Sequence, residues 1–230
     1  EDIELTDMQA QFDAMVLTTG SWRLDRPDIS GANLDGIVGA VGFVMDSLAG
    51  EQRAVGDRVV VIGDDDSAFD AARVAVRLQL SAGKAIDVKL ILSDSTIEST
   101  SSGNERREAE LDGVSVHAGW ELVECVGDGN VDSVKCKPTM RDPEDMATLG
   151  PERNRDRGTW EVELPAETVI LSSARSGDLG FLNGIAGIEG GPLIEVDAST
   201  GRTGAVGIYA GGDVASGAAT IIDAVQAGHV

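Results

Sequence analysis

VVVIGDDDSAFDAAR, residues 59–73, decides the fold class of this chain. Four apolar residues lead into Gly63, and a helix-like run begins at Ser67. A strand, a tight turn and a helix in this order are typical of a dinucleotide-binding unit, in which the helix N-terminus faces a pyrophosphate. Residues 64–66, however, are all aspartates, where a pyrophosphate needs bare backbone and positive potential. The stretch predicts the shape of the unit and leaves its ligand in question.

Three positions of this turn decide whether a dinucleotide fits. The first needs glycine for the turn, the second glycine for approach of the pyrophosphate, and the third glycine or alanine for helix packing. Gly63 and Ala68 satisfy the first and third, and together with Ser67 they are candidate cofactor-binding residues. Asp65 occupies the second position, where each like-charge contact costs roughly 4 kcal/mol at ~4 Å and an effective dielectric near 20. We therefore expect NAD(H) binding to be possible but weakened by Asp65.

Two other interpretations of the aspartates remain open. Acidic residues in the first turn of a helix stabilise the helix dipole by ~0.5 to 1 kcal/mol each without any ligand. Carboxylates also bind Mg²⁺ or Ca²⁺, but nothing else in the sequence supports a metal site.

Strand-like and helix-like segments alternate along the rest of the chain. This alternation predicts an α/β fold with a Rossmann-like, doubly wound parallel sheet. The predicted strands are 12–20, 58–63, 85–93, 113–120, one within 160–174, one within 192–204, and 207–212. The predicted helices are 37–49, 67–80, a short one before 112, and one from about Ala218 after a turn at Asp213; 140–158 is expected to be a loop.

The two cysteines lie in one predicted hairpin. Residues 121–138 are typical of two strands around a turn at 127–130, and we expect Cys125 and Cys136 to lie nearly opposite each other. A reduced, buried pair is the default expectation, with a redox role as the alternative. The absence of a CxxC pair and the presence of only two histidines, His117 and His229, argue against a metal site.

The chain is strongly acidic. Its formal net charge is −22, from 40 Asp plus Glu against 18 Lys plus Arg. Such a field disfavours nucleic acids and anionic membranes as partners, and no apolar run is long enough to span a bilayer. We expect a salt-adapted, halophilic cytoplasmic protein whose self-repulsion is screened at high ionic strength. An ordinary solvated acidic surface is the alternative.

The order of motifs resembles a known family. FDAMVLTTG, ISGANLDGI, RVVVIG with DAARVAVRL, ELPAETVIL and IYAGGDVASGAATIIDAVQAG occur in the order seen in glutamate synthase small (beta) subunit-like flavoproteins of the pyridine nucleotide-disulfide oxidoreductase group. The resemblance covers essentially the whole chain, and the C-terminal GGD…ATIIDAV run is its most specific part. It implies an FAD-binding domain (1–36 and 173–230) split by an inserted NAD(P)-binding-like domain (37–172). It also implies that a four-cysteine region and the first glycine-rich loop precede residue 1, so FAD binding would need that N-terminal part.

The resemblance assigns further cofactor-binding residues. Asp213 is expected to contact FAD, next to glycines that permit close backbone approach and to free N–H groups at a helix start. Thr18-Thr19-Gly20 matches the family's Ala-Thr-Gly, whereas Ser173-Ala174 replaces its Ile-Gly. The residues assigned to FAD are Gly20, Gly211, Gly212, Asp213, Ala219 and Thr220.

The end of the strand 85–93 concerns the choice between NADH and NADPH. Similar proteins carry arginines there for the 2′-phosphate of NADPH, whereas this chain reads Leu92-Ser93-Asp94. Asp94 is suited to a ribose 2′-hydroxyl, which favours NAD(H), or is simply a solvated loop residue. Arg106 and Arg107, further along, are candidates for an adenylate contact or for a charged helix face.

Two functions follow from the resemblance. In the first, the chain is part of an FAD-dependent oxidoreductase that passes electrons from NAD(P)H through flavin to a partner subunit or iron–sulfur protein. The cofactor then carries the chemistry, so no catalytic side chain is expected. In the second, a rewired or non-catalytic relative keeps the fold, has lost NAD(P)H binding, and acts as a scaffold or receives electrons from another protein.

Overall fold

The chain folds as two compact units in a computed structural model that describes residues 3–24, 26–51, 54–93, 103–139, 161–172, 175–188, 191–217 and 219–229. The terminal unit comprises residues 1–25 and 174–230, and the central unit comprises residues 26–173. Residues 26–36 thus pack with the central unit. The assignment of an FAD-binding and an NAD(P)-binding domain to these parts stays a prediction.

The central unit is built on a parallel sheet of five strands, in the order β3-β10-β4-β5-β6. Every neighbouring pair in it is parallel. Its strands are β3 (Ile37–Gly39), β4 (Val59–Ile62), β5 (Val88–Leu92), β6 (Ser115–Ala118) and β10 (Thr168–Leu171). The α/β prediction with a parallel sheet is confirmed.

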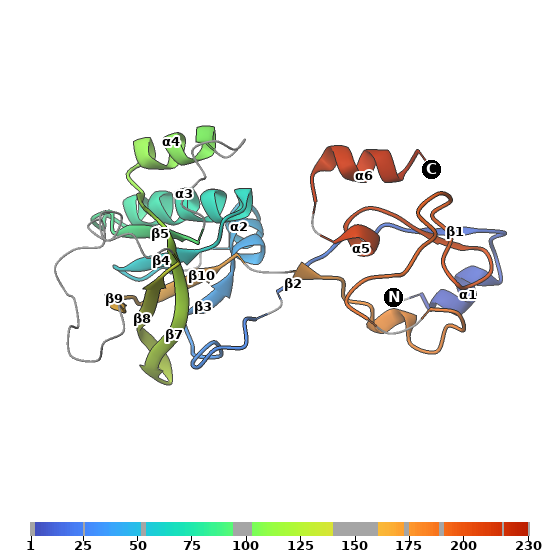
Figure 1. The fold of residues 1–230 in the computed structure, drawn as a ribbon, viewed down its shortest axis with the longest axis horizontal. Coiled ribbons are helices and arrows are strands. Elements are labelled where there is room, and N and C mark those ends of the chain that lie inside the picture. Colours follow the sequence, from blue (N-terminus) through green and yellow to red (C-terminus); the bar gives the residue numbers. More distant parts are fainter. Residues whose placement is uncertain are drawn as a thin grey trace. The chain divides into compact units, whose positions relative to one another are not determined.

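Helices and a second sheet cover the parallel sheet (Figure 1). The helices α2 (Ala40–Leu48), α3 (Asp66–Ser81) and α4 (Gly103–Asp112) lie together on one side, and the second sheet lies toward the other. The second sheet is antiparallel and consists of β7 (Trp120–Asp128), β8 (Asn130–Pro138) and β9 (Val162–Pro165). Because both faces of the parallel sheet are covered, its central strands are nearly continuous apolar runs.

The core of the central unit joins α3 to the sheet. Phe69 and Ala72 of α3 are fully buried, as are Val61 of β4, Leu90 of β5 and Ile170 of β10. Apolar residues recur along α3 at helical spacing, and this places one face of the helix on the sheet.

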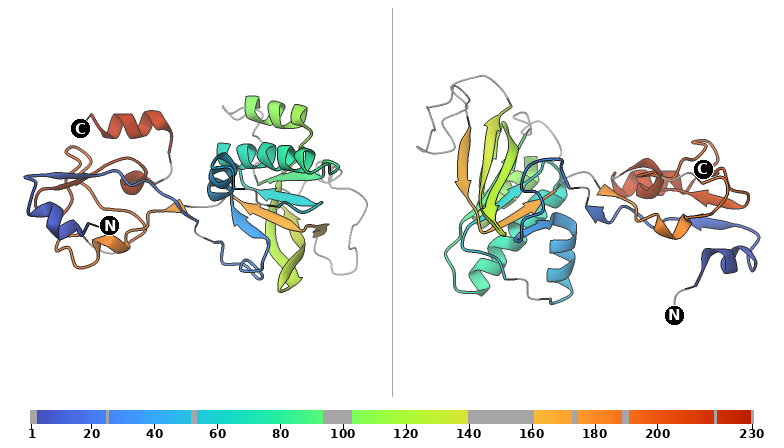
Figure 2. Two further views of the ribbon diagram at one scale, coloured as in Figure 1. Left: turned by 180° about the vertical axis from the view of Figure 1, so that it is seen from behind. Right: turned by 90° about the horizontal axis from the view of Figure 1, so that it is seen from below.

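The terminal unit is smaller and has its own core. Its parallel pair is β1 (Met15–Leu17) with β12 (Ile208–Ala210), and β2 (Arg23–Leu24) pairs antiparallel with β11 (Arg175–Ser176) (Figure 2). Its helices are α1 (Leu5–Gln9), the 3₁₀ turn η4 (Gly180–Leu182), α5 (Asp213–Ser216) and α6 (Ile221–Ala227). Met15, Leu17, Ile194, Ile208 and Val214 form the buried cluster.

The last helix contributes nothing to that cluster. No residue of α6 is buried, and Ile221 and Ile222 are 83% and 76% exposed. Val16 of β1 is also exposed, although its neighbours on the strand are buried. One face of this unit therefore remains apolar and uncovered. In the described part of the chain, no helix combines the length and apolarity needed to cross a membrane.

Several predicted elements differ from the structure. The stretch 37–49 is a strand followed by a helix rather than one helix, because Ile37 pairs with Val169 at the edge of the parallel sheet. Residues 160–174 contain two strands, β9 and β10, rather than one. No strand forms within residues 192–204, all of which are described. The ladder contact recorded there is an isolated antiparallel bridge between Arg202 and Tyr209 of β12.

The end of the chain is also arranged differently. Asp213 begins the short helix α5, and the last helix begins at Ile221 rather than near Ala218, because Thr220 caps it. The segment 140–158, expected to be a loop, lies outside the described residues, as do Asp94, Ser173 and Ala174.

The hairpin that carries the cysteines forms, but the cysteines are not opposite each other. Cys125 pairs with Val134, and Cys136 pairs with Leu122. The hairpin turns at Gly129, between Asp128 and Asn130, and Cys136 lies farther from this turn than Cys125 does. Both thiols are free and buried.

Candidate cofactor sites

The first candidate site lies where three strands of the parallel sheet end. In the sheet, β4 lies between β5, the next strand along the chain, and β10, which comes more than a hundred residues later in the sequence. Open α/β sheets bind ligands outside the carboxyl ends of their strands at such a switch point. The residues that follow the three strands, Gly63, Ser93 and Ser172, therefore mark the predicted nucleotide site.

Two features favour glycine at position 63: its backbone conformation and the close approach of Ser172. Its φ is +149°, a conformation that side chains disfavour. A Cβ added to it would lie 2.5 Å from the carbonyl oxygen of Ser172 and 2.6 Å from the Ser172 Cβ. The glycine therefore lets the ends of β4 and β10 approach each other.

Asp65 fills the phosphate position with its own carboxylate. It is the N-cap of α3, and its Oδ1 accepts hydrogen bonds from the Ala68 N–H at 3.1 Å and from the Ser67 hydroxyl at 2.8 Å. The Ser172 hydroxyl donates a short hydrogen bond to the same oxygen. A backbone N–H at a helix start and two hydroxyls are the donors that a bound phosphate would use. A negative group already occupies them.

Asp64 points to a different place. Its Oδ1 accepts from the Ser93 N–H at 2.7 Å, and its Oδ2 accepts from the Ser93 hydroxyl at 2.6 Å. The Ser93 carbonyl in turn accepts from the Thr139 hydroxyl at 2.9 Å. Asp66 lies in the first turn of α3 and is exposed, as the other two aspartates are. The three consecutive aspartates therefore occupy three different environments.

The predicted nucleotide residues are brought together only in part. Gly63, Ser67 and Ala68 lie at the switch point, around the carboxylate of Asp65. Asp94 lies outside the described residues. Arg106 forms an ion pair with Glu110 one turn along α4, at 3.0 Å. No binding role was predicted for Ser93, Ser172 or Thr139. Their position just after strands is the signal that could have indicated one.

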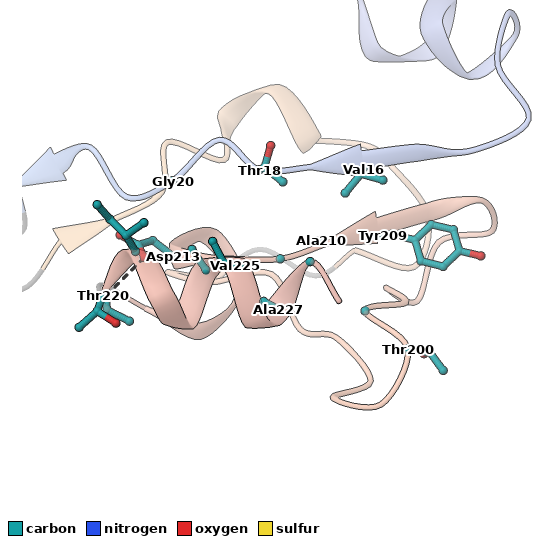
Figure 3. A pocket seen from close by; sticks show the side chains of 17 residues that line it. Val16, Thr18, Gly20, Thr200, Tyr209, Ala210, Asp213, Thr220, Val225 and Ala227 are labelled. Atoms are coloured by element: carbon teal, nitrogen blue, oxygen red, sulfur yellow. Dashed lines mark hydrogen bonds between the residues drawn. The ribbon is translucent and has the colours of Figure 1, made fainter. Parts of the chain in front are cut away.

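The second candidate site is a pocket of the terminal unit (Figure 3). It has a volume of about 590 Å³ and lies between α6 and one face of the β1–β12 pair, where Val16 and Tyr209 point. All six residues assigned to FAD line it: Gly20, Gly211, Gly212, Asp213, Ala219 and Thr220. Their role in binding a cofactor stays a prediction, while their convergence on one pocket is a property of the fold.

Asp213 is held in place from several sides. Its carbonyl oxygen accepts from the Ser21 hydroxyl at 2.9 Å, and its Oδ1 accepts from the Ala219 N–H at 3.3 Å. Gly212, just before it, has φ +72°, which favours glycine. The carboxylate is thereby fixed at the wall of the pocket.

The start of α6 is closed by a capping box. The Thr220 N–H donates to Asp223 Oδ2 at 3.0 Å, and the Asp223 N–H donates to the Thr220 hydroxyl oxygen at 3.3 Å. These hydrogen bonds from Thr220 hold the pKa of Asp223 below its ordinary value. The expectation that the N–H groups of Ala219 and Thr220 are free was wrong, because Asp213 and Asp223 accept from them.

One half-buried histidine, His117, was not assigned a role by the sequence. Both ring nitrogens of His117, on β6, are buried and lack a hydrogen-bond partner among the described residues. Burial lowers the pKa of His117, and the nearby cation of Lys89 lowers it further. Both causes favour the neutral imidazole over its charged form.

The cysteines are not suited to redox chemistry in this fold. Burial is the main cause that raises the pKa of Cys125 to about 11 and that of Cys136 to about 12. Reactive cysteines need a lowered pKa and access to solvent. No cluster of ligands suited to a metal ion occurs among the residues whose placement is described.

Comparison with known proteins gives consistent matches. Residues 3–228 match the family described as pyridine nucleotide-disulphide oxidoreductase. The chain is 30% identical over 233 residues to the NADP(+)-dependent formate dehydrogenase subunit beta of Moorella thermoacetica, covering 99% of this chain and 32% of that protein. It is 26% identical over 247 residues to the glutamate synthase [NADPH] small chain of Escherichia coli, covering 99% of this chain and 51% of that protein.

A solved structure shares the fold. The thioredoxin reductase of T. acidophilum superposes with a TM-score of 0.65 at 23% identity, covering 94% of this chain and 62% of that protein. The chain thus spans a third to a half of the two curated relatives, and under two thirds of the structural one.

Proposed function

The chain belongs to the pyridine nucleotide-disulphide oxidoreductase family, and on that premise we propose that it is part of an FAD-dependent oxidoreductase of the glutamate synthase small-subunit type. In this role it passes electrons from NAD(P)H through flavin to a partner. The partner is an electron-accepting subunit or an iron–sulfur protein. Two relatives are described in their names as a subunit beta and a small chain, which supports a partner for this chain as well.

The observation that carries the proposal is the pocket of the terminal unit. Six residues assigned to flavin from sequence motifs line a single cavity of about 590 Å³, within the range of small-molecule sites. Glycines line part of its wall, so a flat ring system can approach the backbone closely. The fixed carboxylate of Asp213 is suited to accept hydrogen bonds from cofactor hydroxyls. These features fit a flavin.

Flavin, when bound, supplies hydride acceptance and electron transfer. The residues of this chain bind and orient it: Gly211 and Gly212 by close backbone approach, and Asp213 by hydrogen bonding. The resemblance implies a glycine-rich loop for the FAD pyrophosphate, and the two curated relatives are longer than the part that this chain matches. Stable FAD binding is therefore proposed for a protein that carries such a loop together with residues 1–230.

A second candidate function is favoured by Asp65. Because its carboxylate holds the donors of Ser67, Ala68 and Ser172, a dinucleotide must displace it before its pyrophosphate reaches the start of α3. In this alternative the central unit no longer binds NAD(P)H, and the flavin receives electrons from another protein or the chain acts as a scaffold. Cytoplasmic localisation is a prediction common to both functions.

One titration separates the two functions. NADH and NADPH are added in turn to the full-length, FAD-loaded protein under anaerobic conditions, and the flavin absorbance is followed. Bleaching at sub-millimolar nucleotide supports the first function. No bleaching at millimolar nucleotide, together with bleaching by a reduced iron–sulfur protein, would support the second. The variant Asp65→Gly serves as the internal comparison, because it restores the glycine of the motif.

A further inference from the structure

The carboxylate of Asp64 closes the end of strand β5. Each of its oxygens accepts one hydrogen bond from Ser93, the residue that directly follows β5, at 2.7 and 2.6 Å. Thr139, at the end of β8, holds the Ser93 carbonyl from the other side. Asp64 is therefore anchored through two bonds to a strand end and not merely exposed in a loop.

This position is the ribose end of a dinucleotide unit. In such units the pyrophosphate lies at the helix that follows the first strand, and the adenosine ribose lies at the end of the second strand. An acidic side chain there accepts from the 2′-hydroxyl of NAD, whereas an arginine accommodates the 2′-phosphate of NADP. In the dinucleotide unit of this chain, β4 is the first strand and β5 the second. Asp64 therefore lies where the 2′-hydroxyl of NADH or the 2′-phosphate of NADPH would lie.

We propose that Asp64 is the residue that selects NADH over NADPH in the central unit. The inference rests on the first function proposed above, in which this unit binds a nicotinamide nucleotide. The 2′-phosphate carries close to two negative charges at neutral pH, and a carboxylate a few ångströms away repels it. A 2′-hydroxyl can instead donate a hydrogen bond to that carboxylate.

Ser93 strengthens the selection. Its N–H and hydroxyl are the donors that a 2′-phosphate would need at the end of β5, and both are already bonded to Asp64. NADPH thus meets a negative charge and loses two donors at once. This role differs from that of Asp65, which obstructs the pyrophosphate common to both nucleotides.

The test measures how tightly the adenosine half of each nucleotide binds to the full-length, FAD-loaded protein. Isothermal titration calorimetry gives the dissociation constants of 5′-ADP and 2′,5′-ADP, which differ only by the 2′-phosphate. The background is Asp65→Gly, because this change relieves the common obstruction and glycine is tolerated at a helix N-cap. We expect 5′-ADP to bind at least about tenfold more tightly than 2′,5′-ADP.

Two variants of Asp64 are compared with one control. Asp64→Asn removes the charge and should bring the two dissociation constants within about threefold of each other; Asp64→Ser is the second choice if the first fails to fold. Asp66→Asn removes the same charge from an exposed neighbour that does not bond Ser93, and it should leave the ratio unchanged within about twofold. Raising the salt concentration should shrink the ratio in the background protein but not in Asp64→Asn.

Three results overturn the inference. If the probes bind equally in the background protein, or if Asp66→Asn alters the ratio as much as Asp64→Asn, Asp64 is not the selecting residue, although nucleotide binding stands. If neither probe binds to the native protein, the background or the double variant, both the inference and the first proposed function fail. The protein-fed alternative then remains.

Discussion

The hydroxyl of Ser172, at the end of β10, donates a hydrogen bond to the carboxylate of Asp65, 107 positions earlier in the chain. This bond joins β10, the strand of the parallel sheet that comes last in the sequence, to the start of α3. It also places a fixed negative charge at the point where a dinucleotide would place its phosphates. The helix terminus is thus capped from within the chain, and the first prediction concerns the removal of that cap.

Asp65→Gly should raise the affinity for NADH by at least about tenfold, because it removes one like-charge contact and frees the hydroxyls of Ser67 and Ser172. The unfolding free energy should fall by only about 1 kcal/mol or less, since glycine is a fair N-cap. Asp65→Asn is the matched control, because it keeps a capping oxygen but removes the charge, and its gain should be smaller. Nucleotide fluorescence titration measures the affinity, and an unchanged affinity in Asp65→Gly would contradict this role.

Gln79→Leu should destabilise the central unit by about 2 to 4 kcal/mol. The Gln79 side chain is fully buried in α3 and bonds three backbone groups: the carbonyls of Gly56 and Asp57 at 3.1 and 3.0 Å, and the N–H of Asp87 at 3.0 Å. Leucine has a similar size but leaves all three without that partner. Urea denaturation measures the loss. The same change at the exposed Gln226 should stay within about 0.5 kcal/mol.

His117 should make the central unit less stable in mild acid. Its folded-state pKa is lowered by burial and by Lys89, so the unfolded chain binds a proton first as the pH falls. The stability from the neutral imidazole is complete above the unfolded pKa of about 6.5 and is lost as the pH falls below it. His117→Leu should remove up to about 1.4 kcal/mol per pH unit from the slope between pH 6.5 and the lower folded pKa.

The control for this measurement is His229→Leu, because His229 is exposed near the end of the chain. It should leave the slope of stability against pH as in the native protein. If His117→Leu and the native protein lose stability in parallel below pH 6.5, His117 is not the titrating group.

Cys125 and Cys136 should resist alkylation in the folded protein. With pKa values of about 11 and 12, their thiolate fraction at pH 8 is small, and both side chains are buried. Iodoacetamide should react more than about 100-fold more slowly with the native chain than with the chain in urea. Mass spectrometry counts the modified thiols. Fast labelling of either cysteine in the native state would show that the hairpin opens.

The formal charge of −22 predicts that stability rises with salt. The thermal midpoint should increase by several degrees between about 0.05 and 1 M KCl, because salt screens repulsion among the carboxylates. Sucrose, which is uncharged, is the control for general exclusion effects. Equal midpoints in dilute buffer and in 1 M KCl would remove the salt-adaptation hypothesis.

The sequence predicted best those elements whose apolar runs are long. Val59–Ile62 and Val88–Leu92 are continuous apolar or nearly apolar segments, and α3 combines a helical period with an acidic first turn. β3 was missed because three residues, Ile37–Gly39, are too few to show a period before α2 begins. Its identity as a strand depends on pairing with β10, which follows more than a hundred residues later.

The contacts at the predicted nucleotide site depend on which strands lie side by side, and no local sequence pattern shows this. The turn predicted that Asp65 would oppose a phosphate, but not that Ser172 would bond it, because that contact requires β10 to lie beside β4. The cysteines were placed wrongly because the hairpin turns at Gly129, between Asp128 and Asn130, so that Cys136 lies farther from the turn than Cys125 does. By contrast, the motifs around Gly20 and Asp213 identified residues that converge on one pocket, since each motif marks the end of a paired strand.

The exposed helix α6 has a consequence for any preparation of residues 1–230 alone. None of its seven residues is buried, so its own hydrogen bonds and the capping box of Thr220 supply much of what holds it in place. Its amide protons should exchange with solvent earlier than those of the paired strands β1 and β12 in the same unit. Exposed apolar side chains on α6 would then promote self-association of residues 1–230: Ile221, Ile222 and Val225. Aggregation should therefore increase steeply with protein concentration.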